Sequence, residues 1–213
     1  GLPVGHDYLT FVDTPWGTSD ETPDAGGQVI VCRTGYTGER GYELIAPSAL
    51  GPALWDALVA AGADHDLVPA GLGARDTLRT EMGYPLHGQD ISATVTPNEA
   101  RLGWAVGWKK DAFWGRDVLL AEKEAGAKRK LVGLVATGRG IPRPHMSVRL
   151  LKDVPLGEIT SGTFSPTLKK GIALALVAGV VNDEAEVMVD IRGRFEPFQI
   201  TKPPFVQPSV REA

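Results

Sequence analysis

Residues 157–179 read GEITSGTFSPTLKKGIALALVAG, two runs of small and β-branched residues joined by a polar turn. Runs of this kind, bounded by glycine and proline, are typical of β-strands. Comparable runs follow one another at short intervals from Lys130 onward, with glycine or proline at each junction. We therefore expect an all-β module, a small barrel or a sandwich, with six strands: KLVGLVAT (130–137), SVRLLKD (147–153), GEITSGTFS (157–165), GIALALVAG (171–179), AEVMVDIRG (185–193) and RFEPFQIT (194–201).

The pattern changes upstream of a charged link, EKEAGAKRK (122–130). Two runs, QVIVCRT (28–34) and GYELIAP (41–47), flank the glycine-containing segment GYTGER and predict a β-hairpin. A short strand is expected around YLTFV (8–12). Three segments with helical periodicity follow, with Ser48 as the cap of the first and Gly62 as its stop: 48–62, 71–82 and 116–125. The predicted fold class is α+β, with antiparallel sheets and helices in residues 1–127 and the β-module in 130–213.

Composition narrows the functional classes. The chain has 213 residues, 43% of them hydrophobic, and a formal charge of -4 from 22 basic and 26 acidic side chains. Because the charges are well mixed, neither nucleic acid nor an anionic membrane is favoured as a partner. The single cysteine, Cys32, suits a reducing compartment and is interpreted as a buried strand thiol. The first methionine is Met82, so we expect the chain to be a fragment.

Common catalytic signatures are missing from the sequence. The four histidines are scattered without metal-ligand spacing, and no G-x-S-x-G elbow occurs. The segment GLGAR (71–75) is neither a Walker nor a Rossmann phosphate loop. Hydrolase, nucleotide-binding and metal-centre hypotheses are therefore disfavoured.

Glu43 is the first candidate binding residue. On a strand it shares one face with Ile45, while Tyr42 and Leu44 share the other. If its face is covered, the carboxylate needs donors, because a buried unpaired carboxylate is costly. An arginine, backbone amides or a ligand with adjacent N–H groups, such as a pterin, would supply them. The alternative is an exposed acid of the hairpin.

The second predicted helix carries Arg75 and Arg79, one turn apart on the same face. Either they pair with acids of the helix or across the fold, or Arg75 extends into a ligand site as a planar donor. Aromatic side chains follow in RLGWAVGWKKDAFWG (101–115). We expect most of them in the core and one facing a flat ligand: Trp104, Trp108, Phe113 or Trp114.

Several separated motifs together resemble one family. CRTGYTGERGYELIAP, AGLGARDTLRTEMGYPLHGQDI, TPNEARLGW, FWGRDVL and TSGTFSPTLKKGIALALV are similar, in order and spacing, to the C-terminal part of the glycine cleavage system T-protein family, tetrahydrofolate-dependent aminomethyltransferases. The resemblance implies the end of a folate-binding α+β body followed by a C-terminal β-barrel. It also implies transfer of the methylene from aminomethyl-dihydrolipoyl H protein to tetrahydrofolate, with release of ammonia, in the bacterial cytoplasm.

The resemblance implies roles for individual residues. Glu43, in GYE, corresponds to the folate-binding glutamate, and Arg75, in GARD, to a folate-contacting arginine. Arg211 is the candidate for a further contact near the C-terminus, and Tyr36 and Trp104 are candidates for lining the pocket. The family's catalytic aspartate has no counterpart here, so we expect no catalytic residue, no metal and no activity in this chain alone.

Three alternatives stay open from the sequence. The chain could be the folate-binding domain of a dimethylglycine or sarcosine oxidizing enzyme. It could belong with folate-dependent proteins of tRNA modification or iron–sulfur assembly, although their cysteine-containing loop is not seen in GYTGERG. It could also be a non-catalytic folate-binding or interaction module.

Overall fold

The computed structural model describes residues 1–17, 26–150, 154–179 and 182–210, which form two compact units. The first unit comprises Gly1–Arg75 with the C-terminal segment from Pro208, and the second comprises Asp76–Gln207. The expected division into residues 1–127 and 130–213 stays a proposal.

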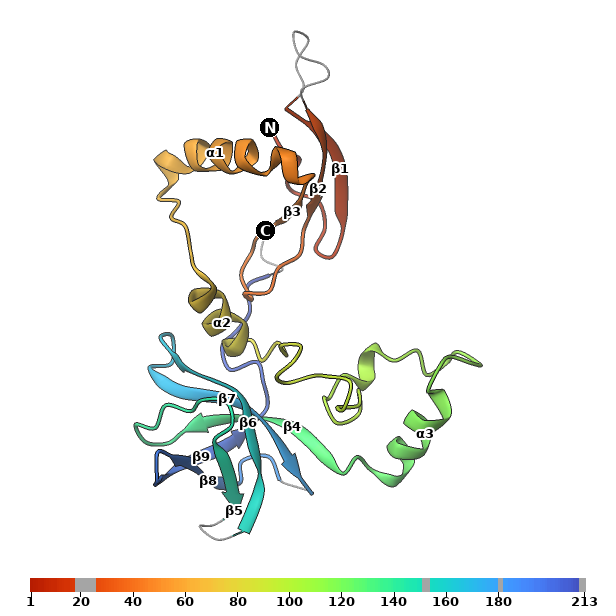
Figure 1. Ribbon diagram of the computed structural model, residues 1–213, viewed down its shortest axis with the longest axis vertical. Coiled ribbons are helices and arrows are strands. Elements are labelled where there is room, and N and C mark those ends of the chain that lie inside the picture. Colours follow the sequence, from red (N-terminus) through yellow and green to blue (C-terminus); the bar gives the residue numbers. More distant parts are fainter. Residues whose placement is uncertain (18–25, 151–153, 180–181, 211–213) are drawn as a thin grey trace. The chain divides into compact units, whose positions relative to one another are not determined.

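The first unit is built on a three-stranded antiparallel sheet in the order β1-β2-β3 (Figure 1). Its strands are β1 (Phe11–Trp16), β2 (Gly27–Cys32) and β3 (Glu43–Ile45), followed by η1 (Ser48–Leu50), α1 (Gly51–Gly62) and η2 (Ala63–His65). Val29 and Val31 alternate along β2 toward Leu54 of α1, and the three form the small core of this unit. The period of two along β2 therefore places its valines under the helix.

Two local expectations for this unit are wrong. The first strand begins at Phe11 because Asp7–Thr10 form a turn in which Leu9 has a φ of 67°. Ser48 is not a helix cap, since it opens η1, and no side chain caps α1. Helix α1 instead begins with Pro52 in its first turn, where the fixed φ of proline suits a helix start. The hairpin of β2 and β3 is confirmed.

The second unit contains a closed antiparallel barrel with the strand order β4-β7-β6-β5-β8-β9 (Figure 1). Before it come the end of α2 (Leu72–Glu81), η3 (Gly103–Ala105) and α3 (Arg116–Ala125). The barrel strands are β4 (Arg129–Ala136), β5 (Ser147–Leu150), β6 (Val154–Ser165), β7 (Lys170–Ala178), β8 (Glu186–Ile191) and β9 (Arg194–Thr201). The expected α+β class with a C-terminal barrel is confirmed.

The barrel has a closely packed core and a close approach between two of its strands. Its core consists of inward aliphatic residues with Phe198 at 0% exposure. Gly157 lies so close to β7 that an added Cβ would come within 2.1 Å of the Leu176 carbonyl oxygen. A glycine is therefore needed at this point of the β6–β7 pair, two residues before the bulge that begins at Ile159.

A buried ionic network joins the C-terminal end of α2 to the barrel within the second unit. Arg79 donates to Asp90 at 2.9 Å and to Asp76 at 2.6 Å. Asp90 also accepts hydrogen bonds from the hydroxyls of Thr160 at 2.5 Å and Ser161 at 2.8 Å on β6. Of the pairings considered for Arg79, the structure thus shows both an acid of its own helix and one further along the chain.

Glu81 makes a second connection at the end of α2. Its carboxylate accepts hydrogen bonds from the hydroxyls of Ser165 and Thr167, and Thr167 N–H donates at 3.3 Å. Glu81 is 2% exposed, so these donors replace the water that it loses.

Among the described residues, no helix is long and apolar enough to span a bilayer.

Candidate functional site

Glu43 opens β3 and pairs with Cys32 of β2. Thr34, just beyond β2, donates its hydroxyl to Glu43 Oε2. Of the two alternatives for Glu43, a covered carboxylate and an exposed acid of the hairpin, the structure shows the exposed acid, and Ile45 on the same face is 58% exposed. A solvated carboxylate carries little desolvation cost, so the fold tolerates it without a ligand. Within the described residues no hydrogen bond reaches Oε1, which leaves that oxygen available as an acceptor.

Arg75 and Tyr36 meet in the first unit. The guanidinium carbon of Arg75 lies 4.5 Å from the centroid of the Tyr36 ring, a cation–π geometry. Arg75 is exposed on α2, and Tyr36 is half-buried in the loop between β2 and β3. The ring fixes the guanidinium while leaving its N–H groups able to donate to an oxygen-bearing ligand.

The C-terminal segment contacts the same loop. Ser209 donates its backbone N–H to the Gly38 carbonyl at 2.8 Å and its hydroxyl to Glu39 Oε2 at 2.5 Å. Sequence reasoning missed both Glu39 and Ser209, because they lie 170 positions apart and no local pattern links them. Arg211, two residues further on, lies outside the described residues.

Trp104 belongs to the second unit and is 82% exposed. The expectation that most of the nearby aromatics are core is wrong, since Trp114 is also exposed and Phe113 is only half-buried. Trp108 is held at its edge, where Nε1–H donates to the Gly103 carbonyl at 2.6 Å. Lys123 of α3 lies 4.3 Å above the centroid of that ring. Within the described residues, only Trp108 of these rings makes a hydrogen bond or a cation–π contact, and none of the four belongs to the barrel core.

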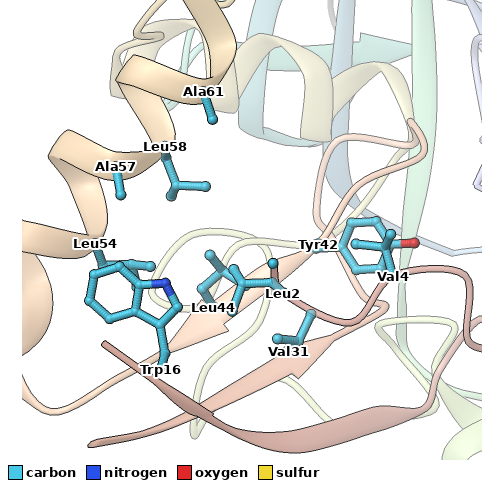
Figure 2. A pocket seen from close by; sticks show the side chains of 11 residues that line it. Leu2, Val4, Trp16, Val31, Tyr42, Leu44, Leu54, Ala57, Leu58 and Ala61 are labelled. Atoms are coloured by element: carbon cyan, nitrogen blue, oxygen red, sulfur yellow. The ribbon is translucent and has the colours of Figure 1, made fainter. Parts of the chain in front are cut away.

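An apolar cavity of about 540 Å³ lies between α1 and the sheet in the first unit. Figure 2 shows Leu54 and Leu58 of α1 on one side, and Leu44 and Trp16 on the other. Leu44 on β3 and Tyr42, just before the strand, flank Glu43 in the sequence, so the cavity adjoins the strand face opposite Glu43. Its lining, within the described residues, includes neither an acid nor an arginine.

Tyr42 forms the polar end of this cavity. Its hydroxyl accepts the Gly5 N–H at 3.0 Å, and this hydrogen bond lowers the pKa of Tyr42 below its usual value. Arg33 lies 5.3 Å from the ring centroid, and its charge lowers the same pKa further. The cavity therefore suits aliphatic packing better than the polar edge of a folate.

Comparison with known families accounts for both units. Residues 6–110 match the family described as GCVT N-terminal domain, and residues 129–207 match the glycine cleavage T-protein C-terminal barrel domain. The chain belongs to the glycine cleavage T-protein family. The second match begins at the first residue of β4 and extends past β9, so it contains the whole closed barrel.

Individual T-protein relatives cover this chain almost completely. The aminomethyltransferase of Frankia alni is 57% identical over 211 residues, and that of Mycobacterium leprae strain TN is 53% identical over 213. Each match covers 99% of this chain but 56% of the relative, so the chain spans about half the length of these relatives. A crystal structure of the glycine cleavage system aminomethyltransferase T from Bartonella henselae is similar with a TM-score of 0.79 and 32% identity, covering 85% of this chain and 50% of that one.

Proposed function

We propose that this chain is the C-terminal part of a glycine cleavage aminomethyltransferase and supplies part of its folate site. The observation that carries the proposal is 57% identity to the Frankia alni aminomethyltransferase over 99% of the chain. Identity at this level over both units favours a shared activity over a shared fold alone. The bacterial relatives and the unpaired Cys32 support a cytoplasmic location.

Tetrahydrofolate fits the donors and acceptors of the first unit. Glu43 offers an acceptor to the adjacent N–H groups of a pterin, and Arg75 offers a planar set of donors beside the Tyr36 ring. We assign Glu43 and Arg75 to polar contacts with the folate and Tyr36 to the wall of its site. Trp104 and Arg211 stay candidates for further contacts.

The proposed reaction moves a methylene group from sulfur to folate. Lipoylated H protein delivers the aminomethyl group, tetrahydrofolate takes its carbon, the amine leaves as ammonia and the sulfur remains as a thiol. The residues of this chain bind and orient folate in this scheme. The family resemblance implies an activating aspartate in the part of the relatives that this chain does not span, so we propose that the chain alone is inactive.

The alternatives have less support. A role for the barrel alone leaves the match of residues 6–110 unused. The relatives reported above are named aminomethyltransferases, which favours that reaction over oxidation of dimethylglycine or sarcosine. The tRNA-modification and iron–sulfur alternative lacks its cysteine-containing loop, since Cys32 lies at the end of β2.

A complementation assay tests the function. The chain would be joined to the part of the Frankia alni relative that it does not match, and 5,10-methylenetetrahydrofolate would be measured with aminomethyl-loaded H protein. We expect turnover by the joined protein and none by the 213-residue chain. A folded joined protein that binds folate but oxidizes dimethylglycine and ignores H protein would contradict the proposal. Turnover by the chain alone would contradict the proposal that it is inactive without the rest of the protein.

A further inference from the structure

The barrel carries a basic pocket at one of its ends. Arg139 and Arg143, from the segment between β4 and β5, line a cavity of about 400 Å³. Arg192, in the turn after β8, and Arg194, the first residue of β9, also line it. Glu196 is the one acid in its lining. The pocket therefore has a local excess of positive charge on a chain whose formal charge is -4.

These arginines are not used in ion pairs of the fold. Among the described residues, none of the four has a carboxylate within salt-bridge distance, and all four are exposed. Among the described residues, the Arg143 guanidinium makes one hydrogen bond, from Nη1 to the Gly162 carbonyl at 3.2 Å. Four like charges with one nearby acid repel one another, so binding of an anion lowers the free energy of the cluster.

The segment that carries Arg139 and Arg143 is fixed in place. At its start the Thr137 N–H and hydroxyl both donate to the Pro197 carbonyl, at 3.1 and 3.0 Å. At its end the backbone of His145 and Met146 bonds to Ile159 of β6 at 2.8 and 2.9 Å.

Close packing fixes the middle of the same segment. An added Cβ on Gly140 would lie 2.7 Å from Ile191 Cδ1, and one on Gly171 would lie 2.1 Å from the Gly140 carbonyl oxygen. The two arginine-bearing segments are thus packed against each other before any ligand binds. A preformed pocket loses less conformational entropy on binding than a flexible one.

We propose that this pocket is a binding site for a multiply charged oxyanion, the phosphate or carboxylate groups of a small molecule. Guanidinium groups pair with both kinds of oxyanion through charge-assisted hydrogen bonds. The volume of about 400 Å³ suits a compact ligand. This site uses none of the residues assigned to folate and does not depend on the aminomethyltransferase proposal.

Titration of the 213-residue chain with two probes tests the site. Pyrophosphate and citrate would each be added at low ionic strength. Calorimetry would measure binding, and NMR chemical shifts of the backbone amides of residues 138–146 and 190–196 would locate it. We expect one-to-one binding of at least one probe, weakened by added salt because the pocket is open to solvent. The tighter probe identifies phosphate or carboxylate as the preferred group.

Matched variants separate the pocket from general charge effects. Arg139→Gln/Arg194→Gln should weaken binding by about tenfold or more, whereas Lys128→Gln/Lys170→Gln removes the same charge elsewhere and should change it by less than about twofold. Glu196→Gln should tighten binding, since it removes the one acid of the pocket. Thermal melts check that each variant is folded.

Three results would overturn the proposal. They are no binding of either probe by the folded chain, equal weakening by the arginine and lysine double variants, and Glu196→Gln weakening the binding. A short single-stranded oligonucleotide serves as a third probe. If only the oligonucleotide binds and the arginine double variant abolishes that binding, the pocket is a nucleic-acid contact and not a small-anion site.

Discussion

At the scale of single residues, Glu43 is an exposed carboxylate with one oxygen held by Thr34. In the joined protein, Glu43→Gln should weaken tetrahydrofolate binding by about tenfold or more, because the amide replaces an acceptor with a donor that opposes the pterin N–H groups. Calorimetry with tetrahydrofolate measures the loss. Glu186→Gln, which removes an exposed acid from the barrel, is the matched control and should bind folate like the parent.

The melting temperature without folate should be nearly unchanged in Glu43→Gln, since exposed substitutions seldom alter stability by more than about 0.5 kcal/mol. An unchanged folate affinity combined with a much lower melting temperature would instead make Glu43 a structural partner within the hairpin.

Asp90, unlike Glu43, is a fully buried carboxylate at 0% exposure. It accepts hydrogen bonds from a guanidinium, a backbone N–H and hydroxyl groups. Asp90→Asn should reduce the free energy of unfolding of the second unit by about 3 kcal/mol, because Arg79 stays buried while losing one of its two charged partners. Urea-induced unfolding, monitored by amide hydrogen exchange in β6, measures this change in the free energy of unfolding. Asp183→Asn, at an exposed position, is the control. Equal stability of the two variants would show that Asp76 alone satisfies Arg79.

At the scale of elements, the segment before β4 is tied to that strand by Glu99 and Arg129. Glu99 and Thr96 exchange hydrogen bonds, each side chain accepting the backbone N–H of the other residue at 3.1 Å. Arg129 Nε donates to Glu99 Oε1 at 2.8 Å, and this hydrogen bond holds the pKa of Glu99 below its ordinary value. The Leu131 N–H completes the connection by donating to the Glu99 carbonyl at 2.8 Å.

This connection should make stability depend on pH. Because the pKa of Glu99 is lowered in the folded chain, its contribution is complete above the unfolded value of 4.5 and is lost as the pH falls through the lower folded value. Glu99→Gln should therefore cost about 1 kcal/mol at neutral pH, less than a fully buried charged bond because Arg129 is partly exposed. The difference from the parent should shrink on acidification, measured by urea unfolding. A constant difference would exclude ionization of Glu99 as the cause, and Glu124→Gln is an exposed control.

The barrel strands should fold without the first unit, since β4 to β9 close on themselves with short connections. Residues 76–207 should nevertheless melt higher than residues 129–207, because the shorter segment leaves Thr160, Ser161 and Ser165 without Asp90 and Glu81. Circular dichroism and thermal melts of both segments measure this. Identical melting temperatures would mean that the two acids add nothing to the barrel.

At the scale of the whole molecule, the two units have cores of very different size. Within the part of the chain that the structure describes, Val29, Val31 and Leu54 form the buried cluster of the first unit, whereas twelve buried residues form that of the barrel. We expect unfolding in two steps, with amide protection of β2 lost under milder conditions than that of β7. Native-state hydrogen exchange in increasing urea measures both. One cooperative transition with equal protection would contradict the division into two units.

The sequence by itself determined most of the regular elements and the all-β character of the C-terminal module, because periodicity, glycine and proline act between near neighbours. Its strand pattern left a barrel and a sandwich both open, and the family resemblance favoured the barrel, which the structure shows to be closed. Helices α2 and α3 and the six barrel strands lie within a few residues of their predicted bounds. Family resemblance, carried by motifs such as GYE and GARD, was also readable there. Only the tertiary structure decided that Ser209 bonds to Glu39, that Asp90 receives β6 hydroxyls and Arg79, and that four arginines surround one pocket. These contacts join residues far apart in the chain, and a pattern along the sequence specifies neither which distant partners meet nor which charges remain unpaired.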